Sequence, residues 1–520
     1  MHNMRNALSA IALATTTAIV FGGCDDKKFL TEVPYDFVGP ANFYNTSADA
    51  IAAINGVYAS FINTSGDSYY GRNFVMLTEF PTEAVTVYLS ATNERSLVDN
   101  YTFTPAHSYV YSTWQSAYAA INRANSVIER VPPIQMDTTL RKRIVAEAKF
   151  LRAVHYFNLV RLFGGVPVRT SETTDLEGLQ QPRNAAAEVY TLIVKDLVDA
   201  IAVLPARSAY TGADIGRATK GAAKATLAKV YLQRAGTSVG SAADYQLALD
   251  MARQVVADGG YALVADLTTL YDLSNENNTE VLFDIQNTRQ QGLGGRIGSH
   301  MVPRNSSWAA SQNGSFEAEQ PFYDSFADTD KRKAGSFVMS FPNKAGVTVL
   351  YTAAVTASST YGADSPYLNK FIDKTLVTAG QEEPNYIVMR YADLLLIQAE
   401  AANAVGGPTA EAYTAINAVR GRAGLAPLAG LTQTTLRDAI FQERRWELVM
   451  EGPNGFFDSQ RNWDWAKTRI EANMALGRAN TFRNSKYPKA QVALVDKFKL
   501  MPIPQRAIDL NPKLVQNPGW

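Results

Sequence analysis

Long segments with apolar residues at three- and four-residue spacing dominate this sequence. The first, TWQSAYAAINRANSVIERV at 113–131, places Trp114, Tyr118 and Ile121 on one stripe and stops before a proline pair, which predicts a buried amphipathic helix. The second, LRKRIVAEAKFLRAVHYFNLVRLF at 140–163, is followed at once by Gly-Gly-Val-Pro, a combination that ends helices. Two adjacent helices of this length predict a helical hairpin.

The same two-helix unit recurs twice further along the chain. Residues 219–236 and 244–263 form one pair of helical patterns, and residues 389–407 and 410–425 form another. In both pairs small alanines alternate with large apolar residues such as Leu247, which lets antiparallel helices approach closely. Stacked pairs bury a continuous core, as in tetratricopeptide arrays, although the repeats here are degenerate. The predicted fold class is mainly α, with a tetratricopeptide-like helical solenoid core at about 110–260 and 386–451.

Two insertions, at about 61–105 and 262–385, differ in composition from the helical segments. They include NTSGDSYYGRNF, NTRQQGLGGRIGSHMVPRNSSWAASQNGSF and TASSTYGADSPYLNK, which are rich in Gly, Ser, Asn and aromatic residues and lack strong periodicity. Long irregular loops in a compact chain are commonly functional. We therefore expect the helices to form a scaffold and the long irregular insertions to form the ligand-binding side.

The single cysteine, Cys24, follows an N-terminal apolar stretch. Residues 1–23 combine a basic residue, an apolar run too short to span a membrane and two glycines before the cysteine. This layout is typical of a secretory signal peptide and resembles the bacterial lipobox, in which the cysteine is acylated. Residues 24–40 are then the acylated N-terminus and a linker, and Asp25 and Asp26 resemble an acidic surface-export signal or a solvated linker. The alternative is an ordinary signal peptide followed by a buried free cysteine.

The charge balance argues against nucleic acid as a partner. Lysine plus arginine equals aspartate plus glutamate at 49 each, and the chain has no basic block, so nothing favours a polyanion. Beyond Cys24 no apolar run approaches the ~20 residues that a membrane-spanning helix requires. With one cysteine, the chain forms no internal disulfide.

Further segments occur in a fixed order along nearly the whole chain. They are AEAKFLRAVHYFNLVRLFGGVPV at 146–168, GRATKGAAKATLAKVYL at 216–232, YIVMRYADLLLIQAEAAN at 386–403, INAVRGRAGL at 416–425, FQERRWELVMEG at 441–452 and the ending LMPIPQRAIDLNPKLVQNPGW. Together with Cys24 and the 113–131 helix, this combination resembles the SusD/RagB family of outer-membrane nutrient-binding lipoproteins. One departure is EGPNGFFDSQR, where Asn454 lies near a position at which the family usually has arginine, and Ser459 replaces a leucine.

The resemblance implies a single SusD-like globular unit over 41–520, anchored to the outer membrane by its N-terminal lipid and facing the cell exterior. Family members act as lids of a SusC-like TonB-dependent transporter, to which they deliver glycans or, in the RagB branch, peptides. We therefore expect a glycan-capturing lipoprotein of nutrient uptake, with a peptide binder as the alternative. The resemblance implies no catalysis and no cofactor.

The candidate ligand-binding residues are loop aromatics with polar neighbours, because a sugar offers apolar C–H faces rimmed by hydroxyls. They are Tyr69, Tyr70, Arg72, Asn73, Glu79 and Tyr88 in the first insertion, and Trp308 and Tyr323 in the second. The alternative for each ring is that it pins its loop to the scaffold. Trp114, Tyr118, Tyr391 and Trp446 lie on helical stripes and are expected in the core, whereas Trp463 and Trp465 fit either role.

Catalytic interpretations find little support. Past the signal peptide the histidines are His107, His155 and His300, and no pair has metal-ligand spacing. GLGGRIG at 292–298 lacks the lysine-serine ending of a phosphate loop and a following helical pattern, which favours a flexible turn. Glu443 and Glu447 are spaced for helix ion pairs with neighbouring arginines rather than for the two carboxylates of a glycosidase. A glycosidase or a structural surface protein remains the third hypothesis.

Overall fold

The computed structural model describes residues 43–62, 69–87, 93–175, 177–290, 292–309, 311–350, 366–378, 380–479 and 492–520. The predicted signal peptide and the whole of the 24–40 linker, Cys24 included, lie outside these residues, and so does Tyr88. Among the described residues, no helix combines the length and the apolar character that crossing a bilayer requires.

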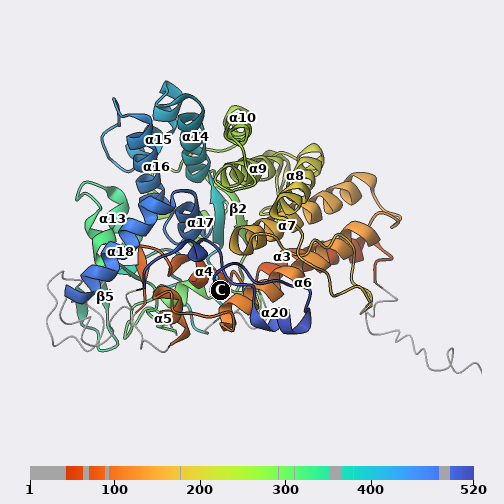
Figure 1. Ribbon diagram of the computed structural model, residues 1–520, viewed down its shortest axis with the longest axis horizontal. Coiled ribbons are helices and arrows are strands. Elements are labelled where there is room, and N and C mark those ends of the chain that lie inside the picture. Colours follow the sequence, from red (N-terminus) through yellow and green to blue (C-terminus); the bar gives the residue numbers. More distant parts are fainter. Residues whose placement is uncertain are drawn as a thin grey trace, which may run out of the picture.

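Helices make up most of the molecule (Figure 1). The α-helices are α3 (Ser47–Tyr58), α4 (Asn73–Glu79), α5 (Glu94–Asp99), α6 (Ser108–Arg130), α7 (Thr138–Phe163), α8 (Ala186–Val203), α9 (Lys220–Ala235), α10 (Ala242–Asp258), α11 (Ile297–Met301), α12 (Gln320–Asp324), α13 (Lys331–Ser336), α14 (Tyr391–Gly406), α15 (Ala410–Arg422), α16 (Gln433–Leu448), α17 (Asn454–Arg461), α18 (Trp463–Ala479) and α20 (Gln505–Leu510). The 3-10 helices are η1 (Ala59–Phe61), η2 (Arg207–Ala209), η3 (Gly212–Asp214), η4 (Leu267–Thr269), η5 (Leu273–Asn275) and η6 (Asp496–Lys499).

The long helices pack in chain order. Helices α6 to α10 each contact the next, α10 contacts α14, and α14 contacts both α15 and α16. In Figure 1 this series runs from α6 and α7 on the right, over α8 to α10 at the top, to α14–α16 at the upper left. The solenoid therefore continues across the 262–385 insertion, and the predicted tetratricopeptide-like, mainly α fold is confirmed.

The helix ends and most of the expected core positions also agree with the prediction. Helix α7 stops at Phe163, and Gly164 follows with a φ of +71°, a conformation that glycine adopts without a Cβ penalty. Ala222, Ala225 and Ala228 of α9 and Ala399 and Ala402 of α14 are buried. Trp114 is buried, and the other three stripe aromatics are partly buried against the core.

Leu247 is an exception, because 40% of its surface is exposed. Helix α10 packs on α9 and α14 through its other face, which carries Ala248, Leu249, Ala252 and Val255. Successive positions on a helix differ by about 100°, so residue 247 lies outside that buried stripe. The prediction that Leu247 packs in the α9–α10 pair is therefore wrong.

Short antiparallel strands connect the insertions to each other and to the helices. They are β1 (Val85–Thr86), β2 (Val281–Ile285), β3 (Glu317–Ala318), β4 (Phe337–Val338), β5 (Ser340–Pro342), β6 (Thr348–Leu350), β7 (Tyr367–Leu368) and β8 (Tyr386–Arg390). One sheet has the order β1-β3-β7-β4, β2 pairs with β8, and β5 pairs with β6. Because β1 belongs to the first insertion and β3 to the second, with Val85 opposite Ala318, the two insertions meet in one sheet.

The C-terminal segment covers the end of the α6–α7 hairpin. The Met501 N–H donates to the Leu162 carbonyl at 2.7 Å, and the Asn517 amide donates to the Phe163 carbonyl at 3.1 Å. These bonds satisfy carbonyls that the last turn of α7 leaves without helical partners. The segment thereby fixes one end of the scaffold.

Candidate functional site

Tyr69 and Tyr70 lie inside the core, with exposed fractions of 0% and 2%. The Tyr69 hydroxyl lies 3.0 Å from Nδ1 of His155, and the Asn158 amide donates to both tyrosine hydroxyls at 2.9 Å. A ring without an accessible face cannot stack on a dissolved sugar. The expected aromatic platform is therefore wrong at these positions, because two polar residues of α7 bind the rings in the interior.

Asn73 is also buried, whereas Arg72 is half-buried. The Asn73 amide donates to the Ser112 hydroxyl at 2.9 Å. Arg72 donates from Nε to the Asn73 side chain at 3.1 Å, and its guanidinium lies 5.9 Å from the ring centre of Tyr109. Asn73 is thus occupied in joining α4 to α6, and of this pair only Arg72 reaches the surface.

Glu79 is fully buried at the end of α4. Its carboxylate accepts backbone N–H groups from Met450 at 3.3 Å and Gly455 at 3.4 Å. Burial raises the pKa of Glu79 to about 7, although the charge of Arg445 acts in the opposite direction. The prediction that Glu79 contacts a ligand is wrong in this conformation, since its oxygens connect α4 to the chain after α16.

Tyr323 belongs to α12 and is 8% exposed. Its ring packs edge-on against Phe337 with centroids 5.0 Å apart, and the Lys333 ammonium lies 4.8 Å from the ring centre. These neighbours cover both the edge and the face of the ring. Tyr323 is therefore packed within the second insertion, against β4, and does not form an exposed platform.

Trp308 is the remaining aromatic candidate, and it is half-buried. Its ring packs at 67° against Phe341 with centroids 6.3 Å apart, and its backbone N–H donates to the Ser306 hydroxyl at 3.1 Å. The Lys374 ammonium lies 4.5 Å from the ring centre, within the range of a cation–π contact. Trp308 thus has a fixed ring whose surface is partly accessible.

The β5–β6 hairpin holds the Trp308 segment in place. Ser306 forms a β-bridge with Asn343, and the Ser307 N–H donates to the Pro342 carbonyl at 2.9 Å. We call the set Ser307, Trp308, Asn343 and Lys374 the Trp308 surface. The Ser307 hydroxyl donates to the Pro342 carbonyl at 3.3 Å, and the Asn343 side-chain oxygen accepts the Ala345 and Val347 N–H groups at 3.0 and 2.9 Å. The Lys374 ammonium, the Asn343 NH2 group and the Ser307 oxygen as an acceptor are what this surface can offer to sugar hydroxyls.

Sequence reasoning missed Phe341 and Lys374 as contacts of Trp308, and Asn343 as the bridge partner of the nearby Ser306. The segments that carry them are 33 or more positions further along the chain. No periodicity or motif marks these positions, since their proximity comes from the pairing of the hairpin with the Trp308 segment.

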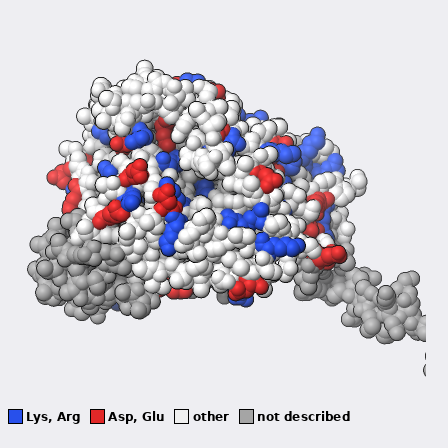
Figure 2. All heavy atoms as spheres, in the orientation of Figure 1, with Lys and Arg blue, Asp and Glu red and all other residues white. Residues whose placement is uncertain are grey.

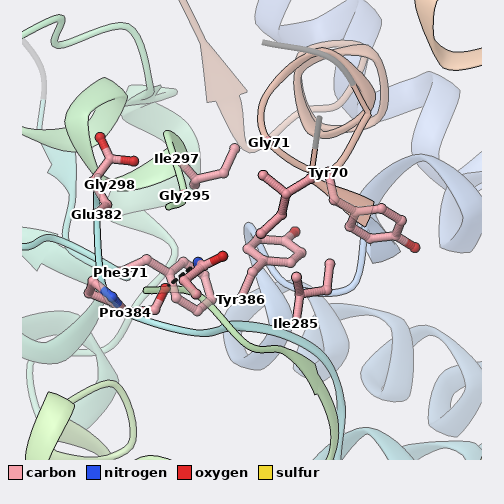
Figure 3. A pocket seen from close by; sticks show the side chains of 12 residues that line it. Tyr70, Gly71, Ile285, Gly295, Ile297, Gly298, Phe371, Glu382, Pro384 and Tyr386 are labelled. Atoms are coloured by element: carbon pink, nitrogen blue, oxygen red, sulfur yellow. Dashed lines mark hydrogen bonds between the residues drawn. The ribbon is translucent and has the colours of Figure 1, made fainter. Parts of the chain in front are cut away.

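A small enclosed cavity lies where the first insertion meets the second (Figure 3). Its volume is about 10 Å³, with Tyr70 on one side and Glu382 on the opposite side. A cavity of this size holds about one water molecule and no sugar. Gly298 borders it, and a Cβ there would lie 2.2 Å from the Phe371 carbonyl oxygen. The GLGGRIG segment is therefore a closely packed joint whose last two residues begin α11, which corrects the expected flexible turn without a helix.

The histidines show no arrangement for catalysis in the described residues. His107, His155 and His300 are all buried, and burial lowers the pKa of each, that of His155 to about 3. Within the part of the chain that the structure describes, no cluster of three His, Cys, Asp or Glu side chains could hold a metal ion.

Glu443 and Glu447 belong to a buried ion network rather than to a cleft. Arg332 donates to Glu443 at 2.7 Å and to Glu447 at 3.1 Å, and Arg390 donates to Glu447 at 2.5 Å. Ion pairing is confirmed, but the partners come from other elements. Arg444 and Arg445, the neighbours expected as partners, bind other acids: Asp393, Asp458 and Glu83.

Asn454, the departure from the family pattern, is buried at the start of α17. Its side-chain oxygen accepts from the Lys229 ammonium at 2.5 Å, and the same ammonium donates to Asp393 at 2.7 Å. The neutral Asn454 thus lies beside the buried Lys229. An arginine at this position would bring a second positive charge next to the Lys229 ammonium and be repelled by it.

Charged residues are mixed on the molecular surface. On the face in Figure 2, lysines and arginines are interspersed with aspartates and glutamates, and no broad field of one sign covers the described part. This distribution agrees with the balanced composition and gives no support to a polyanion-binding face.

The chain matches known proteins over nearly its full length. A family model described as "SusD family" matches residues 225–520, and one described as "Starch-binding associating with outer membrane" matches residues 40–232. SusD-like protein P2 of Formosa agariphila is 30% identical over 487 residues, which are 85% of this chain and 92% of that protein.

Two solved structures show the same fold. A SusD homolog from Bacteroides thetaiotaomicron superposes with a TM-score of 0.81 at 28% identity and covers 92% of this chain and 98% of its own. A structure described as a laminarin-binding SusD-like protein superposes with a TM-score of 0.73 at 26% identity and covers 92% of this chain and 100% of its own.

Proposed function

The chain belongs to the SusD family, and on that premise we propose that it is a carbohydrate-binding lipoprotein of nutrient uptake, not an enzyme. It captures oligo- or polysaccharide at the cell surface and delivers it to a SusC-like TonB-dependent transporter in the outer membrane. The observation that carries the proposal is Trp308, a half-buried indole on the joined insertions of a chain that shares its fold with a laminarin-binding protein.

The physical basis is the match between Trp308 and a pyranose ring. An indole face buries the C–H face of a sugar, while polar groups at its rim bind the hydroxyls. Lys374 provides such a group at the ring, and the NH2 group of Asn343 and the oxygen of Ser307 provide others on the adjoining hairpin and segment. The packing of Trp308 on Phe341 fixes the ring before the ligand arrives. A preformed ring loses little conformational entropy on binding.

The anchor and the partner are proposed from the family and from Cys24. The description of the model that matches residues 40–232 names association with the outer membrane. A lipid on Cys24 would hold the globular unit at the bilayer through the predicted linker. The helical scaffold then leaves the insertions available to ligand.

An affinity screen tests the proposal. The full chain, purified in detergent, is compared with its Trp308→Ala variant against neutral polysaccharides, laminarin first, and against peptide mixtures. We expect one polysaccharide to bind and the variant to lose at least about tenfold in affinity, since a buried aromatic contact of this kind contributes roughly 1–3 kcal/mol.

The matched control is Tyr111→Ala. It removes a half-exposed ring with the Arg506 guanidinium 4.9 Å from its centre, so it resembles Trp308 beside Lys374 at a distant surface. Polysaccharide binding should survive this change. Binding of peptides without binding of any polysaccharide would instead support the RagB-like alternative.

A further inference from the structure

A second, larger cavity lies on the helical side of strand β2. Its volume is about 560 Å³, and its walls come from the α8–α9 connection, the start of α9, the end of α10 and β2. That volume is within the roughly 300–1,000 Å³ of small-molecule sites. We call it the α9 groove and define it by Arg207, Tyr210, Lys220, Tyr261 and Asp284, which are among its lining residues. It shares no lining residue with the Trp308 surface.

Two cations in the α9 groove have no acidic partner among the described residues. Arg207 is half-buried and donates to the Asn277 carbonyl, and no described carboxylate pairs with it. Lys220 is also half-buried, and its ammonium forms no hydrogen bond or ion pair with the described residues, while its backbone N–H donates to the Pro205 carbonyl. Partly desolvated cations without counter-charges attract an anion strongly.

Two other charged residues of the groove, Arg217 and Asp258, are already paired. Arg217 pairs with Glu147 at 3.1 Å and with Asp214 at 2.8 Å. Asp258 pairs with Lys224 at 2.8 Å. The opposite charges in these ion pairs offset each other within the wall of the groove. The positive charge that no acid offsets is therefore that of Arg207 and Lys220.

Asp284 is the acid of the groove that pairs with no described cation. It accepts from the amides of Asn385 at 3.1 Å and Gln286 at 2.5 Å. Burial raises its pKa to about 7, and the charge of Glu276 acts in the same direction. Near neutral pH this carboxyl therefore carries less than a full negative charge, and the groove keeps a positive balance.

Two largely buried tyrosines, each 8% exposed, border the groove in a fixed orientation. The Tyr261 hydroxyl lies 2.7 Å from the Thr219 hydroxyl, and the Tyr210 hydroxyl donates to the Ala218 carbonyl at 3.0 Å. The Arg207 guanidinium lies 5.7 Å from the ring centre of Tyr261. The volume of about 560 Å³ has room for a sugar unit, and the two cations in its lining suit one that carries an acidic group.

We propose that the α9 groove binds a sugar unit that bears an anionic group, either a carboxylate or a sulfate ester. Arg207 and Lys220 bind the anion, and the rest of the sugar unit occupies the cavity, where Tyr210 and Tyr261, each 8% exposed, form only a small part of the wall. This inference rests on the proposed function in taking the ligand to be a saccharide, and it adds a charge-selective site that is separate from Trp308.

Calorimetric or NMR titration of the full chain in detergent tests the groove. The probes are glucuronate, glucose 6-sulfate, neutral glucose and an aspartate-containing dipeptide. We expect at least one anionic sugar to bind at roughly millimolar concentration, glucose and the dipeptide to bind at least about tenfold more weakly, and Arg207→Gln with Lys220→Gln to abolish the binding. Binding of glucuronate would indicate a carboxylate site, and binding of glucose 6-sulfate would indicate a sulfate site.

A charge-matched control is Arg141→Gln with Lys142→Gln. Arg141 also donates to a backbone carbonyl, and Lys142 is exposed on the scaffold, so the control removes equal charge elsewhere and should keep the binding. Gly260→Leu provides a second test. A Cβ at this groove residue meets no atom within 4 Å, so the larger side chain narrows the groove without changing its charge and should weaken the binding of the anionic sugar.

Three results would overturn the inference: no binding of either anionic sugar, equal binding of glucose or the dipeptide, or binding that survives the Arg207/Lys220 double variant. None of these bears on Trp308, whose test uses neutral polysaccharides. Failure of the groove and failure of the proposed function are therefore distinguishable.

Discussion

At the scale of single residues, several buried carboxyl groups have raised pKa values. Burial raises the pKa of Glu79 and Asp284 to about 7 and that of Glu382 to about 8. One oxygen of Glu382 accepts the Ser299 N–H at 3.3 Å, and the other is buried without a hydrogen-bond partner among the described residues. Each of these groups binds a proton more tightly in the folded protein than in the unfolded chain.

The first prediction concerns the pH dependence of unfolding. An acid with a raised pKa in the folded state stabilises the fold fully below its unfolded pKa, and this contribution falls as pH rises toward the folded pKa. For Glu382 the window runs from about pH 4.5 to about pH 8. The unsubstituted chain should lose unfolding free energy as the pH rises through this window. In Glu382→Gln we expect that loss to be smaller by roughly 3 kcal/mol.

Chemical denaturation at pH 5 and pH 8 measures this difference. Glu383→Gln is the control, since it removes a neighbouring charge that is half-exposed and paired with Arg289 at 2.6 Å. A Glu382→Gln variant that loses as much stability between the two pH values as the unsubstituted chain would refute the assigned burial effect.

The residue scale also shows where sequence-based prediction fails. Tyr69 and Tyr70 lie in a Gly- and Ser-rich segment, which indicates exposed aromatics, yet His155 and Asn158 bind their hydroxyls from 85 or more positions away. Trp308 sits in a similar segment and is half-buried. Local composition is alike in the two cases, so only tertiary contacts separate a pinned ring from an accessible one.

At the scale of elements, a buried ion pair joins three consecutive helices. Arg152 of α7 donates to both oxygens of Asp196 on α8 at 2.8 Å and to the Asn125 side chain on α6 at 2.8 Å. The Asn125 amide in turn donates to the Ser171 carbonyl at 2.9 Å. A polar residue in the middle of an apolar helix stripe is satisfied in this way.

We expect Asp196→Ala to destabilise the fold by roughly 3–5 kcal/mol, because it leaves the Arg152 charge buried and uncompensated. The double variant Arg152→Met with Asp196→Leu should recover much of this loss, since no charge then remains buried. Thermal or chemical unfolding of the full chain measures both.

Asp199→Ala on the same helix is the matched control. Asp199 pairs with Lys149 and Lys195 at 2.8 Å and 2.7 Å near the surface, where such pairs contribute about 0–1 kcal/mol. If Asp196→Ala costs no more than Asp199→Ala, the buried pair does not hold the helices together.

Elements with strong periodicity were predictable, and elements without it were not. The helices α6, α7, α9, α10, α14 and α15 follow from apolar spacing and from their glycine and proline stops. The strand β8 occupies residues 386–390, although its last two residues were assigned to a helix. Strands of two to five residues that pair across more than 200 positions, such as β1 with β3, leave no local pattern.

At the scale of the whole molecule, the solenoid and the joined insertions form one frame that the predicted lipid on Cys24 would tether. We expect Cys24→Ser to move the protein from the membrane fraction to the soluble fraction, because each buried acyl methylene contributes about 0.8 kcal/mol. Mass spectrometry of the N-terminal peptide should show the acyl chains on Cys24 in the unsubstituted chain.

Asp25→Asn with Asp26→Asn keeps the thiol and serves as the control for the anchor. This variant should stay with the membrane, and its sensitivity to externally added protease measures whether the two acids direct surface export. An unacylated Cys24 in a correctly processed protein would leave the ordinary signal peptide as the explanation.

The central claim is that a scaffold of stacked helices presents Trp308 to a saccharide. The most direct measurement is a crystal structure of the protein with an oligosaccharide of the polysaccharide that the screen identifies. We predict a sugar ring stacked on the accessible face of Trp308, at about 4 Å, with hydroxyls bound by Asn343 or Lys374. A sugar bound elsewhere, with the Trp308 face empty, would contradict it.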